Sequence, residues 1–96
     1  MNNDDLSHAD RLDIMSAQLR SAVRTDPWPA GTVLRFVYKS YDYLALKAHS
    51  GQWFTTSARD NFVPLSCDYE TLLAFASEEP DSVRVATEWQ GVISGK

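Results

Sequence analysis

The chain has 96 residues, of which 44% are hydrophobic and 23% are charged, and its formal net charge at pH 7 is −4. This composition predicts one small globular domain over residues 1–96, with flexible polar ends at 1–5 and 90–96. The acidic balance argues against a general phosphate-backbone binder, and the single cysteine, Cys67, excludes an internal disulfide. No apolar run reaches the ~18 residues that span a bilayer, and no signal-peptide pattern opens the chain, so we expect a cytoplasmic protein without a membrane partner.

The first predicted element is an amphipathic helix that extends to about Arg24. Ser7 and Asp10 have the spacing of a capping box at its start, and Asp26-Pro27 ends it. Ile14 lies away from the apolar stripe, so it is either a lone exposed apolar residue or a contact point for a second copy or a partner helix. The stripe itself repeats at helical spacing and consists of Leu12, Met15, Leu19, Ala22 and Val23.

The segment from Gly31 to Ser57 predicts three antiparallel strands with turns at 40–42 and 49–52. Side chains alternate between the two faces of a strand, and the more apolar set is expected to face the core. We therefore place Leu34, Phe36, Leu44 and Leu46 in the core. The opposite face, solvated or covered by a partner, then carries Arg35, Lys39, Tyr43 and Lys47.

The rest of the chain predicts one more helix and one more strand. Trp28, between two prolines in the 26–31 linker, is interpreted as a lid on the core or as a recognition element. Ser66 is the expected N-cap of a helix that runs to about Ser77, and residues 82–89 alternate like a strand. The expected fold class is α+β, in the order α-β-β-β-α-β, with an antiparallel sheet of about four strands and two helices packed on one face. The inner positions of the second helix are Tyr69, Leu72, Leu73 and Ala76.

No motif in the chain indicates catalysis. His8, His49 and Cys67 lack the spacing of metal ligands, and no phosphate loop or nucleophile motif is present. Cys67 stands at a helix start, where a thiol pKa can be lowered, or it is a small buried residue, and the sequence leaves its reactivity open. We expect no enzyme, no metal and no cofactor.

Two kinds of binding remain. The first is binding of a host or phage protein, with a homodimer as a further possibility, and the expected contacts are Ile14, Trp28, Tyr41, Tyr43 and Trp53. The alternative is nucleic-acid binding by a basic and aromatic sheet face made of Arg35, Lys39, Lys47 and Tyr43.

Several stretches of the chain carry a resemblance to a known group. They are Pro29–Phe36, Tyr43–Lys47, Gly51–Thr56, Ser66–Leu73 and Val83–Trp89, and together they cover about Pro29 to Trp89. In these structural motifs the chain resembles small accessory proteins encoded by phages of actinobacteria, a group largely of unknown function. The resemblance implies a phage origin, action in the cytoplasm of an infected bacterium, and non-enzymatic binding to a host or phage protein.

Overall fold

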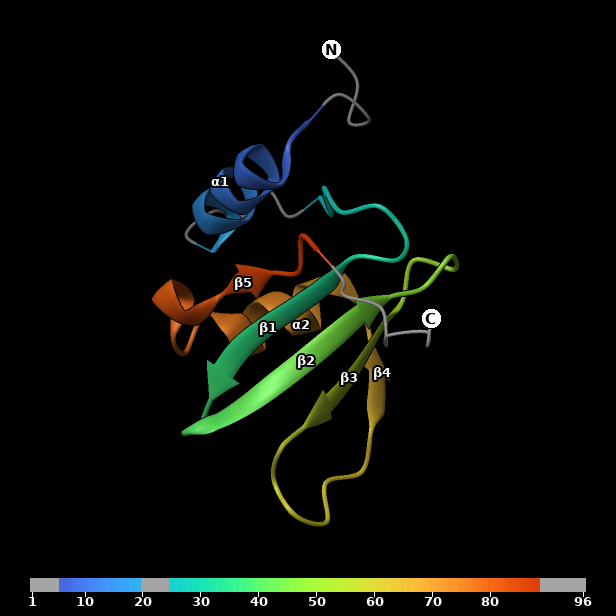
Figure 1. Ribbon diagram of the computed structural model, residues 1–96, viewed down its shortest axis with the longest axis vertical. Helices are drawn as coiled ribbons and strands as arrows, with labels where there is room; N and C mark the ends of the chain where they lie inside the picture. The colour runs from blue at the N-terminus through green and yellow to red at the C-terminus, as the bar shows by residue number, and fades with distance from the viewer. Residues whose placement is uncertain (1–5, 20–24, 89–96) are drawn as a thin grey trace, which may run out of the picture.

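The computed structural model describes residues 6–19 and 25–88, and within them the chain forms an α+β fold built on one antiparallel sheet. The strands lie in the order β4-β3-β2-β1-β5. Figure 1 shows α2 behind the sheet and α1 set apart from it, beyond the end of β1 that follows the 26–31 linker. The elements in chain order are α1 (His8–Gln18), β1 (Val33–Tyr38), β2 (Tyr41–Lys47), β3 (Trp53–Ser57), β4 (Leu65–Cys67), α2 (Tyr69–Ala76), the 3-10 helix η2 (Pro80–Ser82) and β5 (Arg84–Val85).

Helix α1 begins with the expected capping box. The hydroxyl of Ser7 accepts a hydrogen bond from the Asp10 amide at 3.1 Å, and the Ser7 amide donates to the Asp10 carboxylate at 3.3 Å. These bonds satisfy two groups that a helix start leaves open. The predicted end near Arg24, together with Ala22 and Val23, lies outside the described residues, as do the predicted flexible ends.

The hairpin between β1 and β2 is tighter than predicted, and this reverses the expected faces of β2. Lys39 and Ser40 both have positive φ, at 51° and 71°, and form a two-residue turn that pairs Tyr38 with Tyr41. A turn of this kind fixes the register, and a one-residue shift moves every side chain to the other face. The prediction that Leu44 and Leu46 belong to the core, with Tyr43 and Lys47 outside, is therefore wrong.

The inner face of the sheet, towards α2, carries the core. Phe36 and Tyr43 are neighbours across the β1–β2 pair, and their rings stack with centroids 5.7 Å apart. Phe75 of α2 packs edge-on against Tyr38 at 5.0 Å. The four inner positions predicted for α2 are all buried, which confirms that periodicity. The buried apolar residues are Met15, Trp28, Leu34, Phe36, Tyr43, Ala45, Trp53, Tyr69, Leu72, Leu73 and Ala76.

The linker into β1 is pinned to the sheet by Asp26. Its carboxylate accepts hydrogen bonds from Lys47 Nζ at 2.6 Å and from the indole of Trp53 at 2.9 Å. The second carboxylate oxygen accepts from the Trp28 amide at 2.8 Å. Because Lys47 keeps only 12% of its side chain exposed, this ion pair is largely withdrawn from water. The network seats Trp28 over the core.

Both sheet edges differ from the expected strands. Residues 65–67 form β4 against β3, so the N-cap of α2 is Asp68, which accepts from the Thr71 amide at 2.9 Å, and not Ser66. On the other edge, β5 is only two residues long, and η2 precedes it. The Ser82 hydroxyl, just before β5, accepts a hydrogen bond from the Val37 amide at 2.9 Å, so a side chain satisfies β1 beyond the first residue of β5. Trp89, the predicted last strand residue, lies outside the described residues.

Candidate functional site

The sheet face that points away from α2, here called the outer face, carries large apolar side chains that the described residues leave half uncovered. Leu44 and Leu46 on β2 are 46% and 47% exposed, and Phe54 on β3 is 52% exposed. The register places Leu46 directly beside Phe54, with Val33 on its other side. Single exposed apolar residues are ordinary, but a contiguous group on a regular sheet is a feature of interaction sites.

A shallow hollow opens on the β5 side of this apolar group. Its volume is about 310 Å³. It is lined by residues of β1, β2 and β5. The lining is Val33, Arg35, Leu44, Arg84, Val85 and Ala86.

The charged groups of the outer face are engaged with neighbouring groups of the chain. The guanidinium of Arg35 lies 3.0 Å from the Asp42 carboxylate, and both side chains are well exposed, at 61% and 48%. Arg84 donates from Nη1 to the carbonyls of Asp81 at 2.7 Å and Val83 at 2.9 Å. Exposed pairs of this kind add little stability.

Three of the five residues predicted to contact a protein partner are core residues. Trp28 is 3% exposed, Tyr43 is 5% exposed and Trp53 is fully buried. The other two lie on different elements: Ile14 is half-buried on α1, and Tyr41 is exposed at the start of β2 with Arg59 over its ring at 5.3 Å. The structure therefore does not bring the five together as one surface.

The four residues of the nucleic-acid alternative do not share a face either. Arg35 lies on the outer face, whereas Lys39 is in the hairpin turn with its ammonium 5.4 Å from the Tyr38 ring. Lys47 and Tyr43 belong to the inner face, where Lys47 is paired with Asp26 and Tyr43 is buried. The shorter turn is the cause, because it sends Tyr43 and Lys47 inward.

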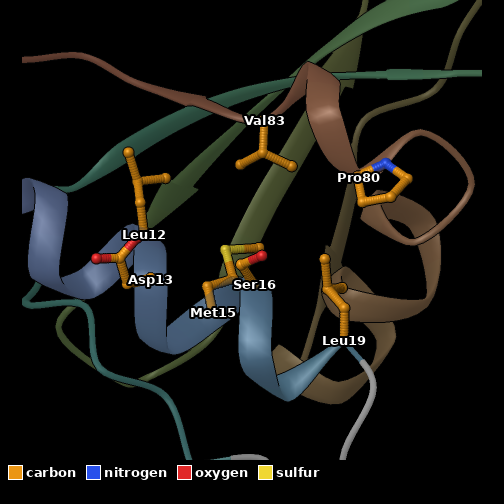
Figure 2. Close-up of a pocket in the computed structure, with 7 residues that line it drawn as sticks. All are labelled: Leu12, Asp13, Met15, Ser16, Leu19, Pro80 and Val83. Atoms are coloured by element: carbon orange, nitrogen blue, oxygen red, sulfur yellow. The ribbon is translucent and has the colours of Figure 1, made fainter.

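A second, smaller groove lies between α1 and the segment before β5. Figure 2 shows Leu12, Met15 and Leu19 extending from the helix towards Val83 and Pro80. Its volume is about 180 Å³, and Asp13 and Ser16 complete the lining. Ile14 does not line it. The groove is smaller than the 300–1,000 Å³ typical of small-molecule sites, so it does not indicate a ligand pocket.

The His and Cys side chains that the structure describes do not form a catalytic arrangement. Cys67 is half-buried on β4, and burial, followed by the negative charge of Asp68, raises the pKa of its thiol above the ordinary value. A raised pKa keeps the thiol protonated at neutral pH, which is the opposite of an activated nucleophile. His8 stacks on Trp28 at 6.3 Å, and His49 is exposed in a turn. Within residues 6–19 and 25–88, no three His, Cys, Asp or Glu side chains are grouped to hold a metal ion.

The residues that sequence reasoning missed are Leu44, Leu46 and Phe54. A signal for them is visible in the segment YDYLALK, which is apolar at both its odd and its even positions. Apolar residues at both alternating sets of positions are typical of a strand that is covered on both faces. The described residues cover only one of them.

Comparison of the chain with protein-family models, with curated proteins and with solved structures gave no match in any of the three. In the part of the chain that the structure describes, no helix is long and apolar enough to cross a membrane.

Proposed function

We propose that this chain is a non-enzymatic protein-binding protein and that the outer face of its sheet is the binding surface. The observation that carries the proposal is the contiguous apolar group Leu44, Leu46 and Phe54, each about half exposed on the two paired strands β2 and β3. Apolar side chains on a rigid scaffold, with polar groups around them, are the usual anatomy of a protein interface. The role that goes with it is that of an accessory protein acting on a host or phage protein, as the resemblance to phage proteins implies.

Nucleic-acid binding is supported less well by the same surface. Phosphate contacts need free cations, and the two arginines of the outer face are engaged, Arg35 with Asp42 and Arg84 with main-chain carbonyls. The aromatic residue expected to stack on bases, Tyr43, is buried. The net charge of −4 also opposes this alternative.

Site-specific photo-cross-linking tests the proposal. A photoreactive phenylalanine analogue replaces Phe54 on the outer face, and a matched control carries it at Ala74, an exposed position of α2. Both proteins are irradiated at high concentration alone and in an actinobacterial lysate, with and without nuclease. We expect protein adducts at position 54 that are absent at position 74.

Two results would contradict the proposal. The absence of any adduct specific to position 54 would show that no protein covers the outer face. Adducts with nucleic acid that disappear after nuclease treatment would favour the alternative instead.

A further inference from the structure

We infer that the occupant of the outer face is a second copy of this chain, packed sheet on sheet about a twofold axis that runs along β2. The inference rests on the proposed function and names the partner for that same surface. It follows from the order of side chains that the strand register imposes.

The outer face consists of successive rows across β1, β2 and β3. The first row is Val33, Leu46 and Phe54, and all three are apolar. The second row is Arg35, Leu44 and Thr56, and the third begins with Val37 and Asp42. Apolar character is thus continuous from Leu44 to Leu46 on β2 and across the first row.

A twofold axis along β2 exchanges β1 of one copy with β3 of the other and keeps each row opposite itself. Leu46 then meets Leu46 of the second copy, and Leu44 meets Leu44. Across the first row, the small Val33 lies opposite the large Phe54. This alternation of small and large side chains is what two interdigitating sheets need to fill the space between them.

A twofold axis across the strands gives poorer contacts. If it passes through the second row, Leu46 of one copy faces the carboxylate of Asp42 in the other. If it passes between the first two rows, Val33 faces Arg35 and Phe54 faces Thr56. Both placements bury polar or charged groups against apolar ones, which is unfavourable. With the axis along β2, Arg35 lies opposite the polar Thr56 of the second copy, so this axis is preferred to those two placements.

The charges at the rim fit the same arrangement. The two Asp42 carboxylates approach each other across the axis, in the row beyond Leu44. Each already has an arginine, Arg35, within 3.0 Å on its own chain. The two copies thus bring two carboxylates and two guanidinium groups together, and the rim of the interface is balanced in charge.

The available area sets the strength of this association. The five strands have 6, 7, 5, 3 and 2 residues. With strands about 4.8 Å apart and about 3.3 Å per residue, they offer roughly 360 Å² of flat area per copy. With the relief of the side chains, two copies bury roughly 1,000 Å², at or below the low end of specific interfaces. The dimer is accordingly weak and exchanges with monomer as concentration changes.

Sedimentation equilibrium over a wide concentration range measures this association directly. We expect the mass of the unaltered chain to rise from 10.8 kDa towards twice that value. Leu46→Lys places an ammonium group on the axis and should weaken the dimer at least about tenfold, because a charge would be buried without a partner. Ala74→Lys, on the exposed side of α2, is the matched control and should associate as the unaltered chain does.

Cross-linking with a short bifunctional maleimide tests the axis. In a Cys67→Ser background, Leu44→Cys or Leu46→Cys should each link to its own equivalent, because both lie on the axis. Packed sheets are about 10 Å apart and off-axis equivalents about 14 Å, so Val33→Cys or Phe54→Cys alone should react poorly while a mixture of the two reacts well. Strong self-linking at position 54, with none at 44, would overturn the placement of the axis.

The outcomes separate this inference from the proposed function. A chain that stays monomeric at every concentration, but forms adducts with a different protein from position 54, overturns the dimer and leaves the protein-binding surface standing. A monomer whose position 54 links only within its own chain would show that another part of this chain covers the face, and it overturns both. A monomer without adducts also overturns both.

Discussion

The two faces of β2 differ in a way that composition alone does not explain. On the inner face, the small Ala45 is fully buried beside Tyr43, whereas on the outer face the larger Leu44 and Leu46 remain about half exposed. The inner layer is filled by aromatic rings from β1 and α2, so the strand itself needs only a small side chain at position 45. The apolar residues of one strand thus divide into two sets: one is buried and holds the fold together, and the other remains about half exposed, which is the basis of the proposed binding surface.

The largest expected effect comes from removing one phenylalanine from each face. Phe36→Ala empties a fully buried site and should lower the free energy of unfolding by about 3–5 kcal/mol. Phe54→Ala, on the outer face, should change it by no more than about 1 kcal/mol at a concentration where the chain is monomeric. Urea unfolding followed by tryptophan fluorescence measures both. Equal losses would mean that Phe54 belongs to the core.

A smaller contrast concerns the ion pair on each face. Asp26→Ala leaves the ammonium of Lys47, which is 12% exposed, without its carboxylate and should cost about 3 kcal/mol. Arg35→Ala breaks the exposed pair with Asp42 and should cost no more than about 1 kcal/mol.

The double variant Asp26→Ala/Lys47→Met provides the control for the inner pair. It removes the buried charge together with its partner, so it should recover part of the stability lost in Asp26→Ala. No recovery would indicate that the hydrogen bonds from Trp53 and the Trp28 amide, rather than the charge of Lys47, account for the loss.

Alkaline pH should lower the free energy of unfolding through Tyr69, which is buried on the inner side of the sheet. Its hydroxyl donates to Gln18 at 2.6 Å, and burial, followed by the negative charge of Asp26, raises the pKa of Tyr69 far above its ordinary value of 10.0. The folded protein therefore keeps a proton that the unfolded chain releases above about pH 10, so the free energy of unfolding falls as the pH rises beyond that point. Tyr69→Phe should flatten this part of the pH profile. An unchanged slope would assign the alkaline loss to another group.

The smallest effect is kinetic and concerns Cys67 at the edge of the sheet. Because burial and Asp68 raise the pKa of its thiol, iodoacetamide at pH 7 should modify the folded protein several-fold more slowly than the urea-unfolded chain. Mass spectrometry of quenched samples measures the rate. Faster modification of the folded form would show an activated thiol.

Local signals in the sequence predicted the elements well. The capping box of Ser7 and Asp10, the turn at 49–52, where Gly51 has a φ of 95°, and the inner positions of α2 depend on neighbours within a few residues, and all three are confirmed. The three-stranded meander and the α+β class are confirmed as well.

The position of the turn between β1 and β2 decides which side chains of β2 lie on the outer face, and local sequence signals do not fix that position. Lys39-Ser40 lacks the Asn-Gly or Asp-Gly that normally marks a two-residue hairpin. The sequence therefore predicts the turn at residues 40–42, and this prediction assigns the side chains of β2 to the wrong faces. Strand β4 was missed because three residues between a loop and a helix carry no periodicity. Long-range pairing, not local preference, decides both features, and for that reason Leu44, Leu46 and Phe54 were not assigned to an open face.

The way in which α1 is attached has a consequence for motion. The helix stands apart from the sheet and docks through the apolar side chains of Leu12, Met15 and Leu19. Polar side chains add to this contact: Arg11 donates to the Pro27 carbonyl at 2.9 Å, and Gln18 to the Thr25 carbonyl at 2.7 Å. Such a helix can detach in a local opening that leaves the strands paired. Its amide protons will then exchange with solvent deuterium well before those of β1 and β2, and the protein will behave as two cooperative units within one small domain.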